Sequence, residues 1–380
     1  MKKYKVKLCG TTSVESAKMA VDAGADYLGV LVNVGISERS LNIEQAKIVA
    51  ESSDISVMTL LYNMSVDDIC HVVDEIKPHG VHLLGNTPVE NVRELKNRLD
   101  CQIWLTVYLP VKGQGEIDVE GIKELMQSYE SAGADVIVID TISLGRYGGT
   151  GKTADWDIAK DFIKSVHIPV FLAGGINPEN VREAIIQGDP YGVDLASGVE
   201  SSKCNRDPEK VKKLMEGVRK TEDEINYSLN ITSRGLEETK NLGRQIGKLA
   251  FAGTVIALCG DLGSGKTAFT QGLAEGLDVQ SFVTSPTFII VNQYNGRLAL
   301  YHIDTYRLRS LDDMYELGYE EFFYSDGVTA IEWAQKVEKL LPEEYLRIEL
   351  EYVSESERQI TIKPYGQRYI DIVNYIRETL

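Results

Sequence analysis

The sequence is short of cysteine and has no long apolar run. Its five cysteines are scattered and none forms a C-x-x-C pair, which excludes a cysteine-rich zinc site and a disulfide framework. No apolar run approaches the roughly 18 residues that a membrane-spanning helix needs, and the polar start MKKYKVKLCG is too short for a signal peptide. We therefore expect reduced thiols, a cytoplasmic protein and no membrane partner.

An excess of positive charge is also missing. Lysine and arginine number 40 against 57 aspartates and glutamates, which gives a net charge of -17. Residues 1–220 carry 25 positive and 32 negative charges, and the remainder carries 15 and 25. Neither part has the basic bulk charge of a nucleic-acid-binding domain, so we expect any connection to RNA to run through a protein partner or a local patch. The length of 380 residues indicates two domains.

The most informative stretch is Thr254–Thr267, an apolar strand pattern that runs into G-x-x-x-x-G-K-T and is followed by a helical pattern. This is the context of a P-loop, whose backbone N–H groups and helix N-terminus hold a phosphate chain. The predicted nucleotide-binding residues are Gly260, Asp261, Leu262, Gly263, Ser264, Gly265, Lys266 and Thr267. In this interpretation Lys266 reaches the β- and γ-phosphates, and Thr267 holds Mg²⁺.

A second glycine-rich stretch, GGTGKT at 148–153, is not predicted to bind a nucleotide. The position of the first P-loop glycine is occupied by Arg146, and no strand directly precedes the stretch. The sequence therefore predicts one nucleotide site.

The first 220 residues alternate between apolar strand patterns and helical patterns. The predicted strands are Tyr4–Cys9, Tyr27–Val32, Ser56–Leu61, Gly80–Leu84, Gln102–Val107, Asp135–Asp140, Pro169–Ala173 and Gly192–Ala196. Eight such units in this length predict a (β/α)₈ TIM barrel, with an open doubly wound sheet as the alternative.

Chemistry in such barrels takes place at the carboxyl ends of the strands. Cys9 ends the first predicted strand and Asp140 ends the sixth. Glycine-rich turns follow the seventh and eighth strands, at Gly174-Gly175 and Ser197-Gly198, where these barrels often bind phosphate. A lone cysteine is commonly a packing residue and a lone aspartate a helix cap, but their place on one face of a barrel favours a functional role.

Several stretches of the first half together resemble phosphoribosylanthranilate isomerase of tryptophan biosynthesis. They are KLCG (7–10), ERS (38–40), IDT (139–141), GGTGKTADW (148–156), LAGGINPENV (172–181) and VDLASGVE (193–200). They follow the order of the family, and GGTGKT-x-D-W together with AGG-x-N-P-E-N-V is specific to it as a set.

The resemblance implies an Amadori rearrangement of N-(5-phosphoribosyl)anthranilate, which needs one acid, one base and no cofactor. Asp140 matches the acid that protonates the ribose ring oxygen, and Cys9 matches the base that removes the C2′ proton. Both groups need tuned pKa values for these roles. Stretch 148–153 would be a mobile loop that closes over the substrate. The implied substrate-binding residues are Arg39 for the anthranilate carboxylate, and Gly175, Ser197 and Gly198 for the phosphate.

The first half departs from the family at the substrate mouth. Residues 82–85 read His-Leu-Leu-Gly where the family usually has Gln-Leu-His-Gly, and Glu38 stands where it usually has proline. The tail SKCNRDPEK (202–210) replaces the usual Gly-x-Lys-Asp run, with Asp207 as the one candidate match. The alternatives are a related phosphoribosyl substrate, or a phosphoribosyl-binding or scaffold module that has lost catalysis.

Residues 221–230 are expected to be a polar linker, and 231–380 a second domain. Strand Leu298–Ile303 ends at Asp304, which predicts a Mg²⁺-supporting carboxylate downstream of the P-loop. A further strand leads to Glu332-Trp333, and two late strands look antiparallel. The pattern predicts a P-loop NTPase α/β domain with a mixed sheet.

This second domain resembles TsaE, the small ATPase of bacterial tRNA threonylcarbamoyladenosine synthesis. The matching stretches are GDLGSGKT-x-F-x-QGL (260–273), SPTF (285–288), YNG (294–296), HIDTYRL (302–308), ELG (316–318) and EW (332–333). The resemblance implies ATP binding and hydrolysis coupled to the proteins TsaD and TsaB, which carry the connection to tRNA.

The same resemblance assigns roles to individual residues. Thr267 and Asp304 would position Mg²⁺, Glu332 would orient the attacking water, and Thr287 lies in a switch-like loop. Trp333 either stacks near the nucleotide or is a core aromatic. A small-molecule kinase is the alternative for this domain, although no lid-like arginine cluster follows the P-loop. The whole chain is interpreted as a bifunctional fusion of an isomerase barrel and a P-loop ATPase.

Overall fold

The computed structural model describes residues 3–110, 117–143, 146–147, 155–285 and 291–379. It divides into two compact units, with the boundary between Glu222 and Asp223. Each unit has its own sheet and its own buried core. Within the described ranges, no helix is both long and apolar enough to span a membrane.

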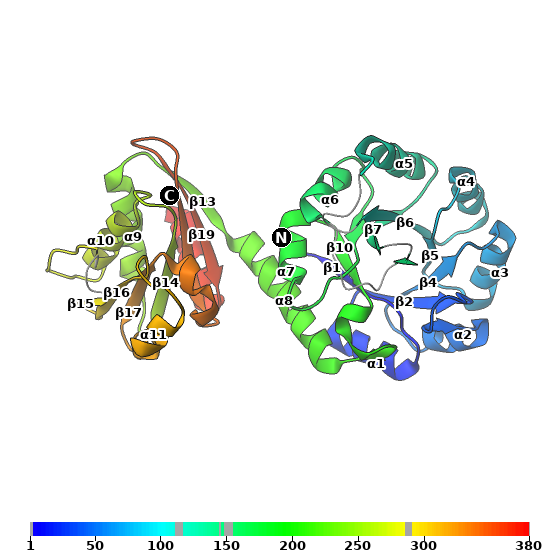
Figure 1. Cartoon of the computed structure of the whole chain (residues 1–380), viewed down its shortest axis with the longest axis horizontal. Coiled ribbons are helices and arrows are strands. Elements are labelled where there is room, and N and C mark those ends of the chain that lie inside the picture. The colour runs from blue at the N-terminus through cyan, green and yellow to red at the C-terminus, as the bar shows by residue number, and fades with distance from the viewer. Residues whose placement is uncertain (1–2, 111–116, 144–145, 148–154, 286–290, 380) are drawn as a thin grey trace. The chain divides into compact units, whose positions relative to one another are not determined.

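The first unit is a closed parallel barrel surrounded by helices, as predicted (Figure 1). The ring closes because β1 pairs with β10 on one side and with β2 on the other. Its strands are β1 (Lys5–Leu8), β2 (Tyr27–Val32), β4 (Ser56–Tyr62), β5 (Gly80–Leu84), β6 (Gln102–Pro110), β7 (Val136–Ser143), β9 (Val170–Leu172) and β10 (Gly192–Leu195). This closure rules out the open doubly wound sheet.

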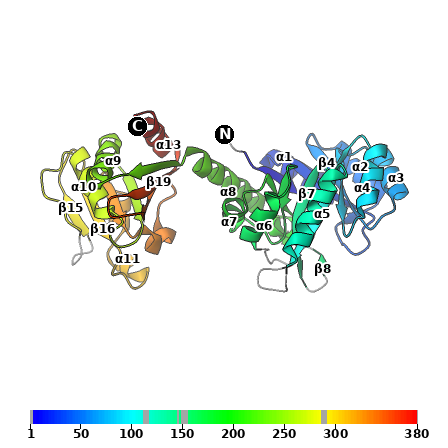
Figure 2. The same ribbon diagram turned by 90° about the horizontal axis from the view of Figure 1, so that it is seen from above.

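The helices of this unit follow the strands in sequence. They are α1 (Val14–Ala23), α2 (Ile43–Glu51), α3 (Val66–Ile76), α4 (Val89–Arg98), α5 (Val119–Ser131), α6 (Trp156–Ile163), α7 (Val181–Gly188) and α8 (Pro208–Tyr227). Short elements near the strand ends are β3 (Ser40–Leu41), β8 (Arg146–Tyr147), η1 (Ser197–Val199), β11 (Glu200–Ser202) and β12 (Asn205–Arg206). Figure 2 shows β8 at one end of the barrel.

Large aromatic side chains fill part of the barrel interior. Trp104 is fully buried, and its ring centroid lies 4.8 Å from Phe171 and 5.0 Å from Tyr27. Trp104 and Tyr27 lie near the amino ends of β6 and β2. Because these aromatic side chains fill the amino end of the barrel, its cavity lies at the carboxyl ends of the strands. Barrel enzymes carry their chemistry at that end.

The second unit has a mixed sheet, as predicted. In the described part of the chain this sheet has seven strands in the order β13-β19-β18-β14-β17-β16-β15. The central strands β14 (Thr254–Cys259), β16 (Leu300–Asp304), β17 (Val328–Glu332) and β18 (Tyr345–Tyr352) are parallel. The antiparallel strands β13 (Leu229–Ser233), β15 (Val291–Tyr294) and β19 (Arg358–Tyr365) complete the two edges.

Helices cover both faces of this sheet. One core cluster joins the sheet to α9 (Leu236–Leu249), α10 (Lys266–Gly276) and α13 (Gln367–Thr379). The other joins it to α11 (Asp312–Glu316), α12 (Glu320–Phe323) and η2 (Ala334–Leu340). The strongly apolar strand β14 is buried along its whole length because it lies between these two clusters.

The predicted linker at 221–230 is wrong in its local structure. Residues up to Tyr227 continue α8, and Leu229–Ser233 form β13, which pairs antiparallel with β19. The helix continues because Val218, Thr221 and Glu224 recur at helical spacing and are all buried. The polar composition of this stretch concealed both the buried helix face and an edge strand that needs burial on one side only.

Candidate functional site

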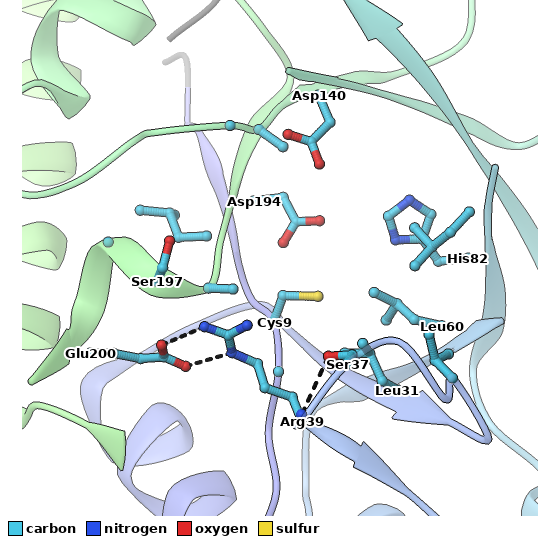
Figure 3. Close-up of a pocket in the computed structure, with 18 of the residues that line it drawn as sticks. Cys9, Leu31, Ser37, Arg39, Leu60, His82, Asp140, Asp194, Ser197 and Glu200 are labelled. Carbon is cyan, nitrogen blue, oxygen red and sulfur yellow. Dashed lines mark hydrogen bonds and ion pairs between the residues drawn. The ribbon is translucent and has the colours of Figure 1, made fainter. Parts of the chain in front are cut away.

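A cavity of about 960 Å³ opens at the carboxyl ends of the barrel strands (Figure 3). It collects every residue that the sequence predicted for the barrel site. These residues are Cys9, Arg39, Asp140, Gly175, Ser197 and Gly198. They come from segments up to about 190 residues apart, and only the closure of the ring brings them together.

Cys9 lies at the floor of the cavity, directly after β1. Its sulfur accepts a hydrogen bond from Lys7 Nζ at 3.3 Å. Burial raises the pKa of the Cys9 thiol to about 11, and the nearby Asp194 carboxylate adds to the rise, whereas the Lys7 ammonium opposes it. The thiol therefore has a cation beside it that favours the thiolate a base requires.

Asp140 stands near the end of β7 on the same cavity. Burial raises the pKa of its carboxyl group to about 7, against a lowering effect of the Thr141 N–H, which donates to Oδ1 at 2.7 Å. A carboxyl group with this pKa still holds a proton near neutral pH, as a general acid must. The two predicted catalytic groups thus lie in one cavity but have different pKa values, about 11 for Cys9 and about 7 for Asp140.

Arg39 points into the cavity, where it forms a two-pronged ion pair with Glu200. Its Nε and Nη2 donate to the two carboxylate oxygens at 2.7 and 2.6 Å. A guanidinium group has five N–H donors, so three remain for another partner. Arg39 can therefore still meet a substrate carboxylate while Glu200 fixes its orientation.

The two glycine-rich turns after β9 and β10 are packed against each other. A Cβ atom at Gly198 would lie 1.9 Å from Ile176 O, so the turns could not approach as they do with a larger residue. Gly198 is the middle residue of η1, in which Ser197 and Gly198 line the cavity. The close approach leaves backbone groups of both turns at the cavity wall, which suits a phosphate group.

Gly198→Ala is expected to lower the free energy of unfolding of the barrel by about 1–3 kcal/mol, because the new methyl group is forced against a backbone carbonyl. Guanidinium unfolding of the full chain would measure the change. Gly35→Ala is the matched control, since nothing lies within 4 Å of a Cβ atom there. Equal stability of the two variants would contradict the packing described.

The departures from the isomerase pattern also lie at the cavity mouth. Glu38 pairs with Lys203 at 2.5 Å, and both line the cavity together with Leu84. Arg206, just before Asp207, is buried and donates through Nη2 to Cys9 O at 3.1 Å. Burial lowers the pKa of Arg206 to about 10. The tail that looked divergent thus supplies a cation that holds the Cys9 backbone.

The sequence analysis missed the buried polar groups beneath Cys9. Lys7 contacts Asp194 at 2.5 Å and His82 at 3.2 Å, and all three side chains are buried. Lys7 and Asp194 each interrupt an apolar strand pattern, which was an available signal for a buried ion pair inside the ring.

The P-loop of the second unit has the predicted arrangement of a strand, a loop and a helix. The loop follows β14, and α10 begins at Lys266 after Gly265, whose φ of 107° favours glycine. Lys266 is only 4% exposed, and its ammonium donates to the carbonyls of Gly260 and Asp261 at 2.8 and 2.7 Å. Burial lowers the pKa of Lys266. The loop therefore curls around its own lysine, in the cradle shape that phosphates need.

Glu332 lies beside the predicted magnesium-binding residues. Thr267 Oγ1 donates to Glu332 Oε1 at 3.0 Å, and His302 Nε2 lies 2.9 Å from the same oxygen. Asp304 is opposite Glu332 in the register of two parallel strands, and its Oδ2 accepts from Ser285 at 2.9 Å. His302 was not predicted as a site residue.

Trp333 follows Glu332 in a left-handed backbone conformation, with φ of 59°. Its ring centroid lies 4.1 Å from Lys266 Nζ and 4.9 Å from the ring of Tyr306. The side chain is half-buried beside the P-loop, which fits stacking near the nucleotide better than a core position. Thr287 and the 148–153 loop lie outside the described residues.

Among the residues that the structure describes, no three His, Cys, Asp or Glu side chains converge on a metal-binding point. The oxygen atoms of Thr267, Asp304 and Glu332 are nevertheless of the hard type that Mg²⁺ prefers. Mg²⁺ is commonly bound by one or two protein groups together with phosphate oxygens and water. The donor set therefore fits Mg²⁺ carried with a nucleotide.

The folds and sites define a chain with two enzyme-type units, a (β/α)₈ barrel with a cysteine and an aspartate in one cavity and a P-loop α/β unit. Comparison with known proteins gives each unit a family. The chain belongs to the N-(5'phosphoribosyl)anthranilate (PRA) isomerase family through residues 6–217, and to the threonylcarbamoyl adenosine biosynthesis protein TsaE family through residues 233–360. The predicted fusion is confirmed.

Individual relatives cover one unit each. The N-(5'-phosphoribosyl)anthranilate isomerase of Methanocella arvoryzae is 36% identical over 219 residues, covering 57% of this chain and 99% of the relative. The tRNA threonylcarbamoyladenosine biosynthesis protein TsaE of Bacillus subtilis is 46% identical over 134 residues, covering 35% and 84%. A crystal structure of the isomerase from Thermotoga maritima is 26% identical with a TM-score of 0.50, covering 57% and 98%.

Proposed function

We propose that the barrel isomerises N-(5-phosphoribosyl)anthranilate to the corresponding 1-amino-1-deoxyketose. The observation that carries the proposal is the cavity that holds Cys9 and Asp140 together, below two packed glycine-rich turns and beside Arg39. The turns would receive the phosphate, and the free donors of Arg39 would receive the anthranilate carboxylate.

The reaction needs two proton transfers, one during the opening of the ribose ring and one after it. Asp140 gives its proton to the ribose ring oxygen while the C1′–O bond breaks and the anilino nitrogen forms a Schiff base. The Cys9 thiolate then takes the C2′ proton, and the electron pair of that C–H bond neutralises the iminium nitrogen. The resulting enolamine tautomerises to the ketone, and the proton on Cys9 is returned to solvent or to Asp140.

The plot of log kcat/KM against pH should change slope near pH 7, from a rise below this pH to a flat region above it. Asp140 is protonated below its pKa of about 7, and Cys9 is a thiolate above its pKa of about 11. Below pH 7 the rate is therefore expected to rise about tenfold per pH unit, because only the thiolate fraction changes. Between the two values the gain in thiolate offsets the loss of protonated Asp140, and the profile becomes flat. A rate that is constant from pH 5 to 7 would contradict these assignments.

For the second unit, we infer an ATPase that supports tRNA threonylcarbamoyladenosine formation together with TsaD and TsaB. Its support is the P-loop around Lys266 with Thr267, Asp304 and Glu332 at the ends of neighbouring strands. Lys266 would hold the phosphates and Thr267 would hold Mg²⁺. When bound, Mg²⁺ would neutralise charge on the phosphate oxygens. Glu332 would orient the attacking water. A cytoplasmic location is part of this proposal.

Two measurements test the two halves separately, and a third tests the partnership with TsaD and TsaB. Loss of phosphoribosylanthranilate fluorescence on addition of the full chain tests the isomerase, and no loss with a folded barrel would favour a binding module. Phosphate release from ATP without an added acceptor tests the ATPase against the small-molecule kinase. Repeated rounds of tRNA modification by TsaD and TsaB only when the chain is added would establish the partnership.

A further inference from the structure

The ammonium group of Lys7 lies inside the barrel with no exposed surface. It contacts three side chains, since Nζ lies 2.5 Å from Asp194 Oδ2 on β10, 3.2 Å from His82 Nδ1 on β5 and 3.3 Å from Sγ of Cys9, directly after β1. An ammonium group has three N–H donors and no acceptor. Each donor therefore has one partner, and the group is fixed in orientation.

The histidine contact also fixes a tautomer. Because His82 Nδ1 accepts from Lys7, the proton of the neutral ring is on Nε2, which donates to Thr106 Oγ1 at 2.8 Å. Burial and the neighbouring Lys7 charge hold the pKa of His82 well below its usual value, so the ring is neutral. His82 thus orients Lys7 without competing with it for charge.

Asp194 is the counter-ion of Lys7, but its carboxylate is only partly satisfied. Oδ2 accepts from Lys7, whereas Oδ1 is buried with no hydrogen-bond partner among the residues that the structure describes. Figure 3 shows the carboxylate of Asp194 between the sulfur of Cys9 and the carboxyl group of Asp140, all on the cavity. Its negative charge therefore acts on Cys9 against the positive charge of Lys7.

We propose that Lys7 is a positioning residue of the isomerase, which holds the Cys9 sulfur as a proton acceptor while Asp194 restrains the same sulfur as a thiol. This rests on the proposed isomerase function. Cys9 therefore has one positive and one negative neighbour. Removing Lys7 is expected to raise the pKa of the Cys9 thiol, and removing Asp194 is expected to lower it. A lysine that served only to fill the barrel interior would have no such directional effect.

Other charged groups also face Cys9, and their side chains are retained in these variants. From the elements packed against Cys9 they are Arg39, Asp140, Glu200 and Arg206. Asp140 responds to both substitutions, because Asp194 raises the pKa of its carboxyl group and Lys7 lowers it.

The test is the rate at which iodoacetamide alkylates Cys9 in the full-length protein at a fixed pH of about 8, followed by mass spectrometry of the Cys9 peptide. Lys7→Met is expected to slow alkylation about threefold for each unit by which the thiol pKa rises. The thiolate fraction falls tenfold per unit, and its greater nucleophilicity recovers part of the loss. Asp194→Asn is expected to speed alkylation by a similar factor. The peptide with Cys101, which lies outside the cavity, is the internal control.

Opposite changes in the two variants support the proposal, and changes in the same direction or no change overturn it. Because Lys7→Met leaves Asp194 buried without its counter-ion, the double variant Lys7→Met/Asp194→Asn is compared with Asp194→Asn alone. The added Lys7→Met must again slow alkylation, and an unchanged rate overturns the proposal.

Two variants of His82 test the orienting contact. His82→Gln offers Lys7 a carbonyl acceptor in place of Nδ1, so alkylation at the wild-type rate is expected, while His82→Leu should slow it. Equal rates in these two variants would remove His82 from the proposal.

Alkylation uses no substrate, so it is independent of isomerase turnover. Opposite rate changes in a chain without isomerase activity would overturn the proposed function and keep the role of Lys7. Isomerase activity with unchanged alkylation rates would do the reverse.

Discussion

Cys9→Ala is expected to reduce the kcat/KM of phosphoribosylanthranilate isomerisation by about 10³-fold while the chain stays folded. Among the described residues that line the barrel cavity, Cys9 is the only cysteine, so the substitution removes the group placed to take the C2′ proton. The lost sulfur is small and lies at the cavity floor, so the surrounding barrel has little packing to lose. The fluorescence decay of the substrate measures the effect directly.

Two further variants make this result specific. Asp140→Asn keeps the shape of the acid and removes its proton, so it should show a loss of the same order. Cys101→Ala removes a half-buried cysteine that does not line the cavity, and it should behave as the wild type. If Cys9→Ala retained a tenth or more of the activity, Cys9 would not be the base and another group in the cavity would have to be sought.

Lys266→Ala is expected to abolish ATP hydrolysis, with a loss of about 10³-fold or more. The buried ammonium lies within the loop and beside Trp333, and no other lysine comes from the P-loop itself. Its removal takes away the fixed charge that a P-loop aims at the β- and γ-phosphates. Phosphate release by the full chain, alone and with TsaD and TsaB, is the measurement.

Lys248→Ala is the matched control for this variant, because Lys248 is an exposed lysine on α9 of the same unit. Its hydrolysis rate should equal that of the wild type. Hydrolysis that persists in Lys266→Ala would show that the P-loop is not the nucleotide site. Isomerase activity should be unaffected in both variants, since the barrel has its own cavity.

The architecture of both units followed from patterns along the chain. The buried strands of the barrel are short apolar runs bounded by turns, so their number and their carboxyl ends could be located, and with them Cys9 and Asp140. The P-loop could be located because its glycines, lysine and threonine are contiguous. In each case the information lies within about ten residues.

The contacts that tune the sites could not be predicted in this way. Lys7 and Asp194 are 187 residues apart and meet only because β1 and β10 close the ring. In the same way, His302 approaches Glu332 across two strands of the sheet. The error at 221–230 has a related cause, since the strand β13 is defined by its pairing with β19 more than by its own sequence.

The pairing of β13 with β19 has a consequence for synthesis on the ribosome. The first strand of the second unit hydrogen-bonds to the last one, at residues 229–233 and 358–362. All of the barrel strands precede this pair in the chain, so the barrel can close while the ATPase sheet still lacks its final strand. During that interval β13 would have an unsatisfied edge, which is the kind of backbone that pairs with other chains. The short length and polar composition of this strand would limit such mispairing until β19 arrives.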